Sequence, residues 1–132
     1  MNRPDAARVP NVGDVALIFE GGGMRAALTS AVAVRLIEEG LVFPFVAGIS
    51  AGATNLVNYL AGDVWRARAS FTSFAADPQF GNWRTFVRGQ GLFHSDYIYR
   101  RTSEEGQALP LNLDAFAAHP ADVRLLIGPT GA

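Results

Sequence analysis

Two glycine-rich stretches, each directly after an apolar run, contain the residues whose types and spacing could do chemistry. Gly21 to Arg25 reads GGGMR, and Gly48 to Gly52 reads GISAG, with Ser50 at its centre. The G-x-S-x-G pattern is typical of a serine nucleophile on a sharp turn between a strand and a helix, where side chains in place of the two glycines would collide with the turn. A run of glycines can expose several backbone N–H groups to an oxygen that gains negative charge. The two stretches together predict acyl transfer at Ser50.

The elements that must position these residues form a strand–helix–strand unit. Val15 to Phe19 and Phe45 to Ile49 are continuous apolar runs, typical of strands buried in a parallel sheet. Between them, Arg25 to Glu39 has leucine and valine residues spaced by four, which predicts an amphipathic helix. Both strands of such a unit end at the same edge of the sheet. We therefore expect the GGGMR stretch to face Ser50 and to bind a substrate carbonyl oxygen. The N-terminus of the helix after Ser50 would favour that oxyanion.

The remainder of the chain gives weaker signals. We expect helices over Ala51 to Leu60, Val64 to Phe74, Trp83 to Val87 and Leu113 to Ala118, and a third strand over Val123 to Ile127. Trp65, Phe71, Phe74, Phe80, Trp83 and Phe86 are interleaved with Arg66, Arg68, Arg84 and Arg88. We favour a helical layer that packs on the sheet with its arginines pointing outward. The second interpretation is a lid that contacts lipid.

Composition excludes several classes of function. The chain has 132 residues, 49% of them apolar, and a net charge of −1, which is typical of one soluble globular domain. Nearly equal numbers of basic and acidic residues, 11 and 12, remove the electrostatic argument for nucleic acid. There is no cysteine and there are two histidines, so we predict no metal and no cofactor. The polar residues 1–14 are interpreted as a lead-in without a signal peptide, and no apolar run approaches the roughly 20 residues of a membrane span. We expect a cytoplasmic protein, at most in peripheral contact with a membrane.

A nucleotide site is the main rival interpretation of the first stretch. Gly21, Gly23 and Ala26 also fit the dinucleotide fingerprint G-x-G-x-x-G/A after a strand. That motif predicts an acidic residue at the end of the second strand, but Ile49 and Ser50 stand there. Glu38 and Glu39 lie at about the right spacing in sequence, at a helix end. The alternative is therefore a nucleotide-binding or phosphate-binding α/β domain that uses the Gly21–Ala26 loop.

With both loops in this order and spacing, the chain resembles the patatin-like phospholipase family, especially its bacterial members. The resemblance is strong from Val15 to Gly62. It implies a parallel-sheet α/β/α sandwich of patatin type and a serine–aspartate dyad without histidine. By this resemblance Ser50 is the nucleophile, the oxyanion hole is formed by Gly21, Gly22, Gly23 and Arg25, and Gly48 and Gly52 shape the nucleophile elbow. The implied substrates are acyl esters of phospholipids or neutral lipids, hydrolysed without a metal through an acyl-serine intermediate.

The chain departs from the family at the catalytic aspartate. That residue belongs to a D-G-G or D-G-A motif, and neither follows Ser50: the downstream aspartates are Asp63, Asp77, Asp96, Asp114 and Asp122, none followed by glycine. We therefore expect residues 15–132 to be the N-terminal portion of a patatin domain, truncated before the aspartate. The exposed sheet edge of such a portion would invite pairing with another chain. A third interpretation follows, a catalytically inactive remnant that pairs with a partner.

Histidines offer a nominal substitute for the missing base. His94, with Asp96 as its orienting partner, would complete a Ser/His/Asp set. We interpret both His94 and His119 as loop histidines without a catalytic role.

Overall fold

A three-stranded parallel sheet forms the base of the structure. The computed structural model describes residues 9–73, 76 and 109–126. The strands are β1 (Ala16–Phe19), β2 (Phe45–Ile49) and β3 (Asp122–Leu126), in the order β1-β2-β3. Phe45 of the central strand aligns with Ala16 on one side and with Asp122 on the other. The predicted α/β class with a parallel sheet is thus confirmed, with strand bounds shifted by about one residue.

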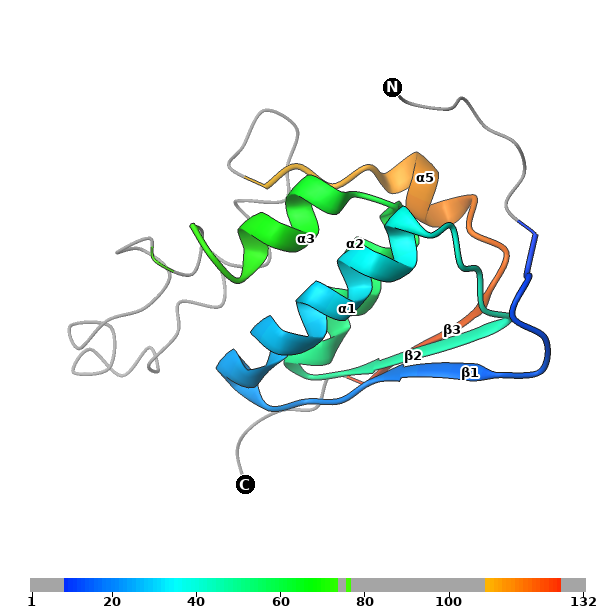
Figure 1. The fold of residues 1–132 in the computed structure, drawn as a ribbon, viewed down its shortest axis with the longest axis horizontal. Coiled ribbons are helices and arrows are strands. Elements are labelled where there is room, and N and C mark those ends of the chain that lie inside the picture. The colour runs from blue at the N-terminus through cyan, green and yellow to red at the C-terminus, as the bar shows by residue number, and fades with distance from the viewer. Residues whose placement is uncertain (1–8, 74–75, 77–108, 127–132) are drawn as a thin grey trace.

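The described helices lie on one side of this sheet (Figure 1). A short 3-10 turn, η1 (Gly23–Arg25), and helix α1 (Ala26–Glu38) connect β1 to β2, and α2 (Ala51–Ala61) follows β2 directly. Helix α2 packs on β1 and β2, whereas α3 (Val64–Ser70) packs on α1 and α2. Helix α5 (Leu113–Ala117) contacts α2 and leads into β3. None of the described helices is long and apolar enough to cross a membrane.

The hydrophobic core lies between the sheet and α2. It consists of Phe19, Ala33, Phe43, Val46, Leu56, Tyr59 and Leu60. Phe19 of β1 is 3% exposed, while its neighbour Ile18 is 59% exposed. Side chains alternate between the two faces of a strand, so this contrast shows that only the helix-covered face of β1 is buried.

The buried face of α1 differs from the predicted one. Leu28 and Val32, two of the residues spaced by four, are 79% and 52% exposed. The buried residues are instead small or β-branched, namely Ala26, Ser30, Ala33 and Val34. These residues allow α1 to approach its neighbours closely, and the Ser30 hydroxyl donates a hydrogen bond to the Ala67 carbonyl of α3 at 2.6 Å. The helix itself was predicted correctly. Apolar residues stand on more than one of its faces, so the sequence pattern did not identify the face that is buried.

Helix α3 also differs from the prediction, because one of its arginines points inward. The expected outward orientation holds for Arg68 but is wrong for Arg66, which is 6% exposed. The Arg66 guanidinium donates to the Asn58 side-chain oxygen and, from Nε, to the Leu109 carbonyl at 3.2 Å. Burial lowers the pKa of Arg66, and the Asp63 carboxylate opposes that shift. Four aromatic residues of the predicted layer or lid, Phe74, Phe80, Trp83 and Phe86, lie outside the described residues.

Candidate functional site

Ser50 occupies a strained turn at the carboxyl end of β2. Its backbone has φ 53° and ψ −123°, and among the described residues it is the one non-glycine residue with a positive φ. Such a conformation costs a residue with a Cβ roughly 1–3 kcal/mol and persists only where the surroundings impose it. Ser50 stands at the N-cap of α2, yet its side chain makes no capping hydrogen bond. The exposed hydroxyl is therefore not used to stabilise the helix.

Contacts from three strands impose this turn. A Cβ placed on Gly52 would lie 2.7 Å from the Phe19 carbonyl carbon, so the start of α2 packs directly on the end of β1. A Cβ on Gly48 would lie 2.9 Å from the Cα of Ala53, which shows that β2 and α2 also approach closely. On the other side, the Ser50 N–H donates to the Leu126 carbonyl of β3 at 3.1 Å. The turn predicted from the GISAG pattern therefore depends on the paired sheet.

The GGGMR loop lies against this turn. A Cβ on Gly21 would be 3.3 Å from the Cβ of Ser50 and 3.2 Å from the Ile49 carbonyl oxygen. Gly22 and Gly23 have φ angles of 144° and 56°, which only glycine adopts readily. No acceptor for the N–H groups of Gly22 and Gly23 lies in the described part of the chain. The loop thus brings uncommitted backbone donors to the edge where Ser50 is exposed.

Arg25 folds back over the same loop. Its backbone N–H donates to the Gly22 carbonyl at 3.2 Å, closing the 3-10 turn. Its guanidinium covers Gly22, where a Cβ would lie 2.9 Å from Nε and 3.0 Å from Nη2. A side chain at Gly22 would displace this guanidinium. Arg25 therefore both supports the loop and adds positive charge beside it.

This arrangement can stabilise an oxyanion next to a serine oxygen. The donors at hand are the loop N–H groups and the first N–H groups of α2, an eleven-residue helix whose N-terminus carries partial positive charge. The N–H of Ala51, which follows the serine, belongs to this set. In the described segments, no three or more acidic or histidine residues gather to hold a metal ion.

The sequence candidates for a base are not brought to Ser50 within the described residues. Asp63 caps α3, where its Oδ1 accepts from the Arg66 N–H at 2.8 Å. Asp114 lies in α5, and Asp122 begins β3 and pairs with Arg124. Asp77, Asp96 and His94 lie outside the described residues.

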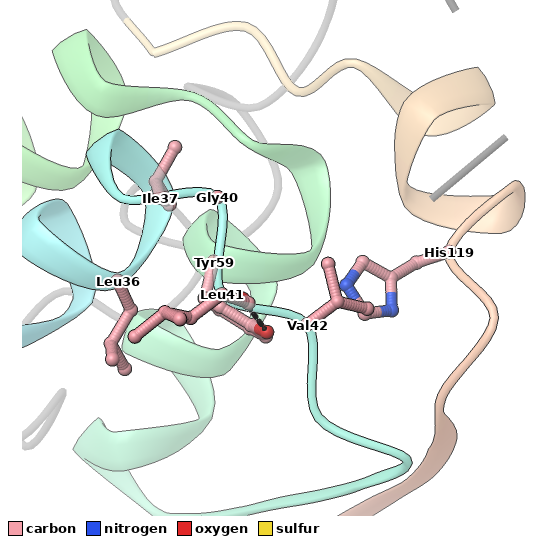
Figure 2. Close-up of a pocket in the computed structure, with 7 residues that line it drawn as sticks. All are labelled: Leu36, Ile37, Gly40, Leu41, Val42, Tyr59 and His119. Atoms are coloured by element: carbon pink, nitrogen blue, oxygen red, sulfur yellow. Dashed lines mark hydrogen bonds between the residues drawn. The ribbon is translucent and has the colours of Figure 1, made fainter. Parts of the chain in front are cut away.

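His119 lies at the opposite edge of the sheet, before β3 begins. It is 8% exposed, its ring is 5.5 Å from that of Tyr59, and its Nδ1 accepts from the Ala121 N–H at 3.3 Å. His119 lines a hollow of about 90 Å³ together with the end of α1, Val42 and Tyr59. Figure 2 shows the residues that line it. The Tyr59 hydroxyl donates to the Leu41 carbonyl there at 2.7 Å. This hollow is smaller than the roughly 300 Å³ of a ligand pocket and lies at the amino ends of the strands, away from Ser50.

Two supporting residues near the loop were missed in the sequence. Asn55 of α2 and Thr29 of α1 are joined by a hydrogen bond of 2.7 Å between Asn55 Nδ2 and Thr29 Oγ1. Asn55 is 0% exposed. A polar residue inside an otherwise apolar helical stretch was the one available signal, because buried amides require partners.

Comparisons with known proteins identify the family of this chain. A family model described as patatin-like phospholipase matches residues 17–126. The chain is also 30% identical over 106 residues to "Uncharacterized protein YjjU" of Escherichia coli (strain K12), a match that covers 80% of this chain and 29% of that protein. The chain thus spans less than a third of this relative, and no solved structure matches it. The family match, which includes both glycine stretches, shows that the chain belongs to the patatin-like phospholipase family.

Proposed function

We propose that this chain contributes the nucleophile and the oxyanion hole of a lipid acyl ester hydrolase. The observation that carries the proposal is the exposed Ser50, held at φ 53° beside the glycine loop, with a hydroxyl that makes no capping hydrogen bond. Family membership supports acyl esters as the substrate class. Residues 15–132 are, in this proposal, the N-terminal portion of a patatin-like domain, and residues 1–14 precede it.

In the proposed reaction, Ser50 Oγ attacks the ester carbonyl carbon and gives its proton to a base. The carbonyl oxygen takes the negative charge and accepts hydrogen bonds from the N–H groups of Gly22 and Gly23, while Arg25 adds positive charge. The tetrahedral intermediate expels the alcohol, which takes up the proton, and leaves an acyl-serine. Water then gives a proton to the base and attacks the acyl carbon. The bond to Ser50 Oγ breaks, the carboxylic acid leaves, and Oγ takes the proton from the base, which restores the hydroxyl.

In this proposal the base comes from beyond the described residues, because no carboxylate or imidazole within them forms a hydrogen bond with the Ser50 side chain. Some reactivity would remain without it, since an oxyanion hole alone can retain part of the rate. The sheet edge could then meet a chain segment that brings the aspartate.

Covalent labelling tests this proposal. The purified chain is treated with a fluorophosphonate probe, and the adduct is located by mass spectrometry in the wild type, in Ser50→Ala and in Ser73→Ala. Ser73 is a matched control because it is also exposed but follows α3. The proposal expects an adduct on Ser50 that is lost in Ser50→Ala and retained in Ser73→Ala. A folded wild type that forms no adduct, or one labelled equally elsewhere, would refute an activated serine in this chain.

A further inference from the structure

Asn55 links the nucleophile helix to the helix that follows the glycine loop. Its Nδ2 group donates two hydrogen bonds across the α1–α2 interface, to the Ala26 carbonyl at 2.9 Å and to Thr29 Oγ1 at 2.7 Å. Thr29 Oγ1 in turn donates to the Ala26 carbonyl at 3.0 Å. Ala26 is the first residue of α1 and directly follows the 3-10 turn of the loop. The Asn55 side chain of α2 thus holds Ala26, the residue at which the glycine loop passes into α1.

The asparagine at this position also carries a cost in stability. Asn55 is 0% exposed, and its Oδ1 has no hydrogen-bond partner in the described part of the chain. A buried acceptor without a donor carries a free-energy penalty that a leucine of similar size would avoid. The Ala26 carbonyl also has a second donor in Thr29, so it does not require Asn55 to be satisfied. What Asn55 adds in return is the pair of hydrogen bonds from its Nδ2 group to the start of α1.

The glycine loop is held at two anchor points. At one end Gly21 packs against the Ile49 carbonyl and the Ser50 Cβ. At the other end the Asn55 amide holds Ala26. Gly22 and Gly23 lie between these points, and glycine backbones rotate more freely than those of other residues. The direction of the loop N–H groups relative to Ser50 hence depends on both anchors.

We propose that Asn55 is a positioning residue that, through Ala26 and Thr29, holds the glycine loop in line with Ser50. This inference rests on the proposed function in one respect, namely that the loop N–H groups stabilise an oxyanion. Asn55 touches no substrate in this proposal. Its effect is on the geometry in which the N–H groups meet the reacting oxygen.

Asn58 provides a matched control in the same helix. It is also an asparagine with 0% exposure. Its side chain points to α3 instead, where Nδ2 donates to Ser70 Oγ at 3.2 Å and Oδ1 accepts from Arg66. Loss of Asn58 would therefore weaken packing away from the loop.

The test compares Asn55→Leu with Asn58→Leu, and Thr29→Val with Thr29→Ser, in the full chain. The rate of fluorophosphonate adduct formation at Ser50 is measured together with the thermal midpoint and with hydrogen exchange over residues 20–29. We expect Asn55→Leu and Thr29→Val to lower the maximal labelling rate roughly tenfold or more, since small misplacements of reacting groups have large effects. Their thermal midpoints should change little, and Thr29→Ser, which keeps the hydroxyl, should restore the rate. Asn58→Leu should lower the thermal midpoint without slowing the labelling of folded protein.

Hydrogen exchange separates this inference from the proposed function. If wild-type Ser50 forms no adduct, the proposed function fails, and faster exchange over residues 20–29 in Asn55→Leu but not in Asn58→Leu still supports the positioning role. Equal exchange in the two variants, or equal labelling rates where Ser50 reacts, overturns it. If Asn55→Leu does not fold, Thr29→Val and Thr29→Ser decide in the same way, because Val differs from Thr only in the hydroxyl.

Discussion

Replacement of Ser50 by glycine should make the protein more stable. The Ser50 backbone at φ 53° and ψ −123° disfavours any residue with a Cβ by about 1–3 kcal/mol, and glycine would release that strain. The greater freedom of glycine in the unfolded chain subtracts about 0.4–1 kcal/mol. Nothing else is lost, because the hydroxyl makes no capping bond and the N–H bond to Leu126 is a backbone interaction. We expect a net gain of about 0–2.6 kcal/mol in the free energy of unfolding.

Urea unfolding of Ser50→Gly, Ser50→Ala and Ser73→Gly measures this gain. Alanine keeps the Cβ and hence the strain, so Ser50→Ala should unfold within about 0.5 kcal/mol of the wild type. Ser73 has no positive φ, so its glycine variant should lose stability through the unfolded state alone. The reasoning is refuted if Ser50→Gly is no more stable than Ser50→Ala. A gain would show that the serine is retained at a cost in stability, as expected at functional sites.

Three further predictions, tested by chemical unfolding, concern the packing of the helices that support this turn. Gly52→Ala should destabilise the chain by more than about 2 kcal/mol, because its Cβ would collide with the end of β1. Gly40→Ala has open space around its Cβ and should lose only about 1–2 kcal/mol, which is the cost of its positive φ. Equal losses in the two variants would contradict the close packing of α2 on β1. Leu56→Ala, at a fully buried position, should lose about 2–5 kcal/mol, and a loss below that range would place Leu56 outside the core. Arg66→Ala should lose at least about 2 kcal/mol of stability, because the acceptors of its guanidinium would be left without that donor. Arg68→Ala breaks only an exposed ion pair and should lose less than about 1 kcal/mol. A larger loss in Arg68→Ala than in Arg66→Ala would be incompatible with the burial of Arg66.

Sequence patterns predicted the strands and the turn that position Ser50, because each of these depends on residues that are neighbours in the sequence. Continuous apolar runs identified β1 and β2, and the glycines at 48 and 52 predicted the turn at Ser50, where the backbone has the strained geometry expected of it. The buried face of α1 could not be predicted in this way. Its sequence is apolar on several sides, so the choice of face depends on α2 and α3, which are distant in the chain.

Partners distant in sequence explain the other differences. Arg66 looked like a surface residue, because arginine usually extends to solvent, and its acceptors Asn58 and Leu109 come from other segments. Asn55 gave the same difficulty: its bonds reach 26 and 29 residues back, to Thr29 and Ala26. Polar residues in an apolar helix indicate that a partner exists, but only the fold identifies it.

The geometry of the turn also shows why Ser50 and the glycine loop belong to one folding unit. The strain at Ser50 is imposed from both sides of β2, by the close approach of Gly52 to β1 and by the bond from the Ser50 N–H to Leu126 of β3. Strand β3 lies about 70 residues beyond the serine, so the turn can be tightened only after a long loop has closed. In the proposed reaction the base does not share this requirement, because it acts on the hydroxyl and not on the backbone. An aspartate could therefore approach the exposed Ser50 after the turn and the glycine loop have formed, whether from a later segment or from a second chain.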